Sequence, residues 1–193
     1  MITFEVEKGA IAKISKNLSE VYMKSPQALK NAVNQTARQA RKLLADKAKD
    51  AYTVKTGRFN KAMTIKNATT RNPTAIIVAK GSPMELKEFR VSPNKPGYNP
   101  KGTTRAKVYS SSVLKALEIR GIKAFIVQFR SGHVSVAQRI GQDRLPIKTL
   151  YSTSIPKMIG NEKEVYGVLE PKIQEILDRC VQVQVEKILS RMR

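Results

Sequence analysis

The chain has 193 residues, 41% of them hydrophobic, and its 36 Lys and Arg side chains exceed its 15 Asp and Glu side chains, giving a formal net charge of +21. This length and apolar content fit one globular domain, expected to span residues 1–193 with a mainly aliphatic core, and they argue against extensive disorder. With a single Cys and a single His, the sequence excludes an intrachain disulfide and the usual zinc ligand sets.

The first quarter of the chain predicts one strand and two helices. Residues 2–7 alternate apolar and polar side chains, the pattern of a half-buried strand, and residues 11–21 carry apolar side chains at helical spacing. Ser25 precedes Pro26, which is typical of a helix N-cap followed by proline at the first helical position. We therefore expect a long amphipathic helix from there to about Ala51. Its predicted apolar stripe comprises Leu29, Ala32, Val33, Thr36, Ala40, Leu43, Leu44 and Ala48.

The middle of the chain predicts a hairpin, a long loop and several strands. Two β-rich runs, residues 63–71 and 74–81, flank Asn72-Pro73 and are expected to form a hairpin. Residues 82–104 contain four prolines, two glycines and several lysines. We expect a long exposed loop there, or a segment that becomes ordered only against a partner. Strand patterns resume at residues 105–110, 123–129 and 133–140.

The C-terminal part predicts one more long helix. Asn161, with Glu164 three residues later, matches a capping box. Apolar side chains at helical spacing then continue to Leu189, and Pro171 is expected to kink this helix or to begin its second half. Cys180 lies on the apolar stripe, where a buried structural thiol is expected. The order of elements predicts an α+β fold, a mostly antiparallel sheet with the long N-terminal-half helix and the C-terminal helix packed on it.

The positive charge belongs to the first long helix and to the middle of the chain. Residues 27–62 carry nine basic and two acidic groups (net +7), residues 87–148 carry thirteen and three (net +10), and residues 161–193 carry six of each. Such an excess favours a polyanionic partner. On the helix, a solvated charged face is the simpler explanation, and a surface that faces an anion is the alternative. The candidate basic contact surface comprises Arg38, Arg41, Lys42, Lys49, Arg90, Lys95, Lys101 and Arg105.

No pattern of catalytic or cofactor chemistry is found in the sequence. Phosphate-binding loops of the Walker or dinucleotide type are absent, and so are the acidic clusters that a two-metal or paired-carboxylate hydrolase needs. His133 follows a glycine at a predicted turn, so we expect it to fix that turn through a hydrogen bond to a backbone carbonyl. The sequence predicts no enzymatic activity, no metal and no cofactor. It also shows no signal-peptide pattern and no apolar run long enough for a membrane span, so we expect a cytosolic protein.

Residues 123–160 combine several short elements in a fixed order. An aromatic strand, Phe125 to Phe129, leads to a Gly-His turn, an Arg-containing strand, a basic-Leu-Pro-Ile segment and a Ser-hydrophobic-Pro step. In this order the chain resembles the minor tail protein Z family of lambda-like phages and prophages. The resemblance extends more loosely over both flanking helices. The residues that carry it are Gly132, His133, Arg139, Arg144, Leu145, Pro146, Ile147, Ser154 and Pro156.

The resemblance implies a structural protein of the virion tail, assembled in the host cytoplasm, and not an enzyme. Similar proteins complete the head-proximal end of the tail and help to join it to the head, commonly as six-fold rings through which the DNA leaves the capsid. The partners implied are other tail and neck proteins, further copies of the chain, and DNA in transient, non-specific contact. The alternative hypothesis is a basic nucleic-acid-binding module that contacts DNA phosphates non-specifically through Arg38, Arg41, Lys42 and a loop at 87–107.

Overall fold

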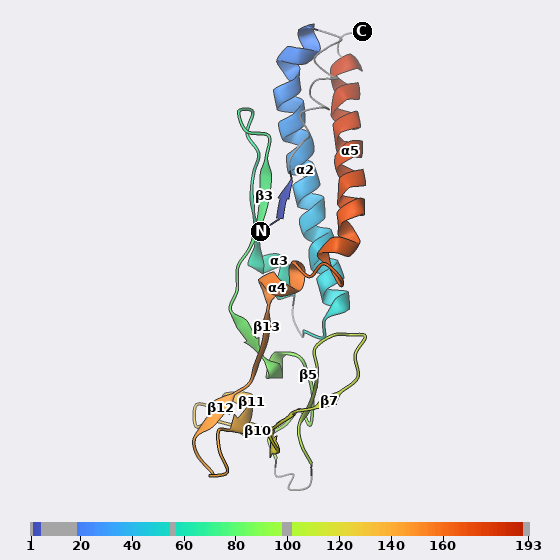
Figure 1. Cartoon of the computed structure of the whole chain (residues 1–193). Coiled ribbons are helices and arrows are strands. Elements are labelled where there is room, and N and C mark those ends of the chain that lie inside the picture. Colours follow the sequence, from blue (N-terminus) through green and yellow to red (C-terminus); the bar gives the residue numbers. More distant parts are fainter. Residues whose placement is uncertain (1, 5–18, 55–56, 98–101, 191–193) are drawn as a thin grey trace.

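The computed structural model of the chain describes residues 2–4, 19–54, 57–97 and 102–190, and it has the predicted α+β fold (Figure 1). The helices are α2 (Ser19–Ala51), α3 (Arg58–Ala62), α4 (Ile155–Ile159) and α5 (Tyr166–Ser190), together with the 3-10 helix η1 (Leu86–Glu88). The strands are β1 (Ile2–Phe4), β2 (Met63–Lys66), β3 (Ala75–Ala79), β4 (Pro83–Glu85), β5 (Arg90–Ser92), β6 (Arg105–Lys107), β7 (Lys115–Ala116), β8 (Glu118–Ile119), β9 (Ile122–Lys123), β10 (Phe125–Gln128), β11 (Val134–Arg139), β12 (Ile147–Thr149) and β13 (Tyr151–Ser154).

The two long helices form an antiparallel pair at one end of an elongated molecule (Figure 1). The predicted apolar stripe of α2 is confirmed, because its members are buried except for Leu43, which is partly buried. Many of them are alanines, and small side chains let neighbouring elements lie close to the helix backbone. Cys180 of α5 is buried as predicted, and the side-chain amide of Gln39 on α2 lies 3.8 Å from its Sγ.

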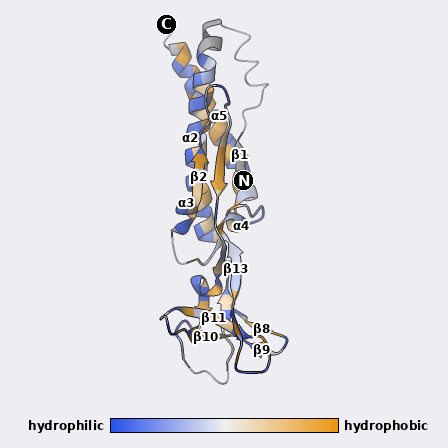
Figure 2. Cartoon of the chain, turned by 90° about the vertical axis from the view of Figure 1, so that its left-hand side faces the viewer, coloured by the Kyte–Doolittle hydropathy of each residue, from blue (hydrophilic) through white to orange (hydrophobic). Residues whose placement is uncertain are grey.

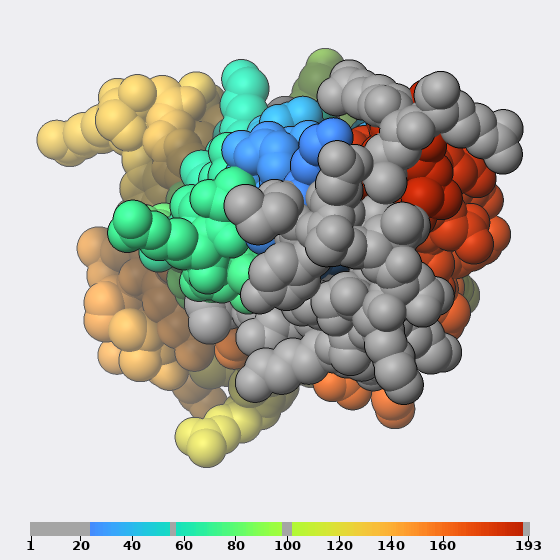
Figure 3. Space-filling model, turned by 90° about the horizontal axis from the view of Figure 1, so that it is seen from above, coloured from blue at the N-terminus to red at the C-terminus, as the bar shows by residue number. Residues whose placement is uncertain are grey.

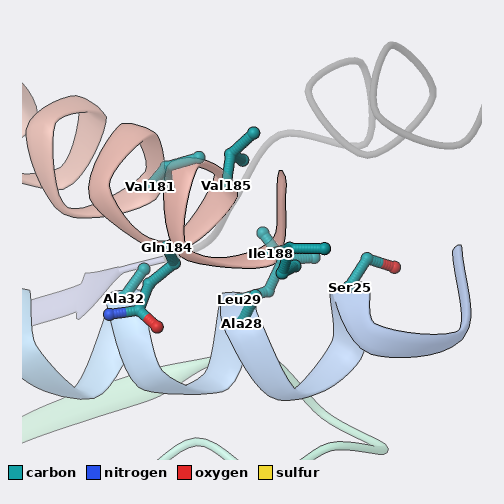
Figure 4. Close-up of a pocket in the computed structure, with 8 residues that line it drawn as sticks. All are labelled: Ser25, Ala28, Leu29, Ala32, Val181, Gln184, Val185 and Ile188. Carbon is teal, nitrogen blue, oxygen red and sulfur yellow. The ribbon is translucent and has the colours of Figure 1, made fainter. Parts of the chain in front are cut away.

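The N-cap predicted at Ser25 is wrong, because α2 begins at Ser19 and contains both Ser25 and Pro26. Ser25 is only 6% exposed and lies in the seam between the two helices, facing Ile188 of α5 (Figure 4). Packing against α5 therefore extends the helix on the N-terminal side of the predicted cap, although Pro26 removes one backbone N–H donor from the hydrogen bonds of the helix. The strand and helix predicted at residues 2–7 and 11–21 fall largely outside the described residues, with β1 and the start of α2 as the described parts.

The predicted hairpin is confirmed as β2 and β3, which pair antiparallel with Ile65 opposite Ile77. Strand β1 pairs on the other side of β3, giving the order β1-β3-β2. The hydrophobic strands of this sheet lie along the helix pair (Figure 2). Ala75 packs with Val33 and Ala37 of α2 and with Leu177 of α5, so the sheet closes a small core at the helical end.

The other end of the molecule is built from short antiparallel strands (Figure 1). Strands β10-β11-β12 form one sheet, β5-β6-β7 a second, and β8-β9 a two-stranded ribbon. The predicted strand at 133–140 is confirmed as β11, and the one at 123–129 is divided between β9 and β10. A second two-stranded ribbon, β13-β4, connects this end to the helical end. We call the two parts the helical end and the β end.

The loop predicted at residues 82–104 is wrong over its first half. Residues 83–92 form β4, η1 and β5, whereas residues 93–97 lie outside any helix or strand. The reason is that this half carries spaced apolar side chains, Met84, Leu86, Phe89 and Val91, all of which are buried. Phe89 has no exposed surface and belongs to the main core cluster, which runs from α2 through η1 to β11 and α5. Pro83 is the first residue of β4 and Pro93 directly follows β5, positions at which proline is tolerated.

Candidate assembly surface

The motif residues follow one path through the β end and along the connecting ribbon to α4, and they do not converge on a single point. Gly132 occupies the turn between β10 and β11, where its φ of 82° and its N–H bond to the carbonyl of Phe129 (2.9 Å) close the turn. A positive φ is strained for other residues, which explains glycine at this position. Arg139 ends β11 opposite Ile147, the first residue of β12.

The His133 side chain bonds a carboxylate on another strand and not the backbone carbonyl that was predicted, although its ring also stacks on Phe129 across its own turn. Its Nε2 lies 3.0 Å from a carboxylate oxygen of Glu85 on β4, and the Ser135 hydroxyl donates to the same oxygen at 2.6 Å. Ser135 is fully buried, whereas the His133 side chain is 54% exposed. Glu85 therefore ties β11 to the connecting ribbon. Sequence patterns gave no signal for this pair, because 48 residues separate its members.

The loop between β11 and β12 exposes apolar side chains. Ile140 is 60% exposed and Leu145 is 67% exposed, and Arg144 and Pro146 beside them are also exposed. The N–H of Ile140 donates to the carbonyl of Pro146 at 3.2 Å, which brings the two ends of the loop together. The basic-Leu-Pro-Ile part of the motif thus forms a protruding surface, and Ile140 is a member of it that the sequence analysis did not identify. We call residues 140–146 the β11–β12 loop.

The Ser-hydrophobic-Pro step joins the connecting ribbon to the helical end. Ser154 is buried, pairs with Pro83 across the ribbon, and precedes α4 without a side-chain capping bond. Pro156 lies in the first turn of α4, where the absence of an N–H costs nothing. The next turn buries Met158 and Ile159 in the main core. This part of the motif therefore supports the fold.

A polar cluster stabilises the junction between the two ends. Asn161 accepts from the backbone N–H groups of Lys163 and Glu164 at 3.0 and 3.1 Å, which is the side-chain half of the predicted capping box, whereas its own N–H donates to the carbonyl of Met158 and α5 begins only at Tyr166. Its amide also donates to the hydroxyl of Tyr52 at 3.0 Å, just after α2. Burial raises the pKa of Tyr52 to about 12, so the phenol is neutral at physiological pH.

The candidate basic residues lie in two groups, one along α2 and one on β5 and β6. Arg38, Lys42 and Lys49 are exposed along α2, and Arg90 and Arg105 are exposed on the neighbouring strands β5 and β6. The backbone N–H of Arg90 donates to Thr53 Oγ1 at 3.2 Å, which places β5 directly after the end of α2.

The remaining candidates differ in their surroundings. Arg41 is partly buried and donates to the carbonyl of Asn60 at 2.8 Å, so it attaches α3 to α2. Lys95 is exposed beyond β5, and Lys101 lies outside the described residues. Within the described part of the chain, no carboxylate forms an ion pair with any of the other seven candidates.

Comparison with known proteins decides the family. The model of the prophage minor tail protein Z family matches residues 8–191. The chain belongs to this family. No curated protein and no solved structure matches the chain significantly. The resemblance seen over the motif residues therefore extends over both long helices.

Membership of the prophage minor tail protein Z family gives the chain a structural role in the phage tail, in contact with other tail proteins. The family is one of structural proteins and not of enzymes. Among the residues that the structure describes, no group of three or more His, Cys, Asp or Glu side chains is placed to hold a metal ion. No helix in the described ranges is both long and apolar enough to cross a membrane.

Proposed function

We propose that the protein completes the head-proximal end of the tail, where it helps to join tail and head as a subunit of a homo-oligomeric ring. Membership of the tail protein family supports a place in the tail, and the shape of the molecule supports a ring. A core cluster shared by the helical end and the β end packs the two ends of the elongated subunit together. Such subunits can repeat a head-to-tail contact with a constant rotation, which is what closes a ring.

The observation that carries the ring proposal is the apolar surface of the β end. Of the eight large hydrophobic side chains that are exposed in the described residues, five lie between residues 113 and 151. Val113, Ile119, Ile140 and Leu145 lie at the β end, and Tyr151 begins β13 of the connecting ribbon. Singly exposed apolar residues are normal, but Ile140 and Leu145 protrude together on the β11–β12 loop, whose ends are joined by a backbone hydrogen bond, and this favours a surface that a partner covers.

The β11–β12 loop is the strongest part of this surface. Full burial of one Leu or Ile side chain contributes about 1.5–3 kcal/mol, so the loop alone can supply a substantial part of a subunit contact. The adjacent strand β12 is an edge strand of its sheet and retains a row of backbone groups that a neighbouring subunit can pair with. In a ring each subunit forms such a contact twice, once with each neighbour.

Sedimentation velocity on the full chain and on the double variant Ile140→Ser, Leu145→Ser tests the ring. We expect the wild-type protein to form one closed oligomer whose size does not grow with concentration, and the variant to sediment as a monomer with unchanged circular dichroism. The matched control is Val168→Ser, Val183→Ser, because these exposed residues of α5 lie outside the β end. A monomeric wild-type protein, or a variant that still assembles, would contradict the proposal.

A further inference from the structure

A groove runs along the outer face of α2 at the helical end. It encloses about 1010 Å³ and has α2 as its floor, the tip of the β2–β3 hairpin as one wall and the last turns of α5 as the other. An end-on view shows α2 (blue) between the hairpin (green) and α5 (red) (Figure 3). Residues that define it are Lys24, Lys30, Asn31 and Arg38 of α2, Thr70 of the hairpin and Lys187 of α5. We call it the α2 groove.

The hairpin wall of the α2 groove is held in place by hydrogen bonds. The buried side chain of Asn34 accepts from the N–H of Ala68 at 2.8 Å and donates to its carbonyl at 3.1 Å. Beyond it, the N–H of Thr69 donates to the carbonyl of Asn72 at 2.8 Å, and the N–H of Asn72 donates back to the Thr69 hydroxyl at 3.0 Å. These bonds fix the distance between hairpin and helix, so the groove is formed before any ligand binds.

The charge of the α2 groove has one sign. Four cationic side chains line it, Lys24, Lys30, Arg38 and Lys187, and no Asp or Glu is among the lining residues. None of the four lies within ion-pair distance of a carboxylate in the described ranges. The other lining groups are mainly amides and hydroxyls. A preformed concave surface with several unpaired cations and neutral donors attracts a polyanion strongly.

We propose that the α2 groove binds the phosphate backbone of double-stranded DNA without reading its sequence. Lys, Arg, Asn, Gln and Thr side chains are the groups that contact DNA phosphates in proteins. From Lys24 to Arg38 the helix advances by about 21 Å at about 1.5 Å per residue. Measured along the axis of a DNA duplex, that length corresponds to about six base pairs at about 3.4 Å each.

An acidic protein segment fits the α2 groove less well than DNA. Protein partners are held mainly by apolar or aromatic anchors in desolvated pockets. The groove offers only Ala28, Ala68 and Ile188 as apolar lining. A ligand whose attraction is purely electrostatic is the better match. The inference does not depend on the ring, because the groove is complete within one chain.

Binding of a short fluorescent DNA duplex of arbitrary sequence, followed by anisotropy over a range of salt concentrations, tests the proposal. The variant is Lys30→Gln, Arg38→Gln, Lys187→Gln, which removes three cations from the groove. We expect its affinity at low salt to fall by about tenfold or more, and the slope of log Kd against log salt to decrease by about 2.7, since each phosphate contact contributes about 0.9.

The matched control is Lys115→Gln, Lys123→Gln, Lys148→Gln, which removes the same charge from exposed positions of the β end. We expect its salt slope to remain that of the wild-type protein. An equal loss of DNA affinity in both variants would show that net charge alone attracts the DNA, and it would overturn the proposal. A wild-type protein without measurable DNA affinity would overturn it as well. Equal competition by polyglutamate of matched charge would also overturn it, because the groove would then be a site for acidic protein.

Discussion

Glu85 shows how one side chain holds distant parts of this chain together. It accepts from the buried hydroxyl of Ser135 and lies 3.0 Å from His133 Nε2, so a single carboxylate connects the ribbon β13-β4 to β11. The two contacts contribute unequally to the free energy of unfolding. An exposed ion pair contributes less than about 1 kcal/mol, whereas a buried hydroxyl that loses its acceptor costs about 1–3 kcal/mol. Ser135 is therefore the more important partner.

This inequality leads to a prediction about unfolding. We expect Glu85→Ala to lower the free energy of unfolding by about 1–3 kcal/mol, because the Ser135 hydroxyl then has no acceptor. We expect His133→Ala to lower it by less than about 1 kcal/mol, because the His133 side chain is 54% exposed. Urea denaturation followed by circular dichroism measures both values. A larger loss for His133→Ala than for Glu85→Ala would show that the histidine dominates the contact.

At the scale of elements, the segment β4-η1-β5 determines how the β end attaches to the rest of the molecule. It contributes Phe89, which is fully buried, and Leu86, whose N–H donates to the carbonyl of Leu150 at 2.9 Å. A segment with this burial belongs to the folding core and does not wait for a partner to become ordered.

Replacement of Phe89 by Ala tests that position directly. We expect the free energy of unfolding to fall by about 3–5 kcal/mol, the range for removal of a buried aromatic side chain. The control is Arg90→Ala, whose side chain is exposed, and which we expect to change the value by less than about 0.5 kcal/mol. Thermal and urea unfolding provide the measurement. Nearly equal stabilities of the two variants would mean that residues 82–104 form the exposed loop that the sequence pattern predicts.

Local patterns in the sequence predicted those elements whose signals lie within a few residues. The apolar stripe of α2, the β2–β3 hairpin, strand β11 and the cap at Asn161 all follow from spacing or turn chemistry. The errors arose where a distant contact decides the structure. Packing against α5 continues α2 through Pro26, and burial of Phe89 in the main core orders a proline-rich segment. The Glu85–His133 pair and the walls of the α2 groove likewise join residues far apart in sequence, and no local pattern encodes them.

At the scale of the whole molecule, the two ends of the subunit differ in the surfaces that they expose. The β end exposes apolar side chains on the β11–β12 loop, which suits contact with a neighbouring subunit, and the helical end carries the basic α2 groove. With the proposed subunit contact at the β end and the proposed DNA contact in the α2 groove, the two contacts do not compete for the same residues.

The central claim is that this member of the prophage minor tail protein Z family works at the head-proximal end of the tail. Immunogold electron microscopy tests it most directly, with an antibody to the chain and particles released on induction of the host that encodes it. The account predicts label confined to the junction of head and tail, and at the upper tip of tails without heads. Label at the distal tip or along the tail tube, or protein left wholly in the soluble fraction, would contradict it.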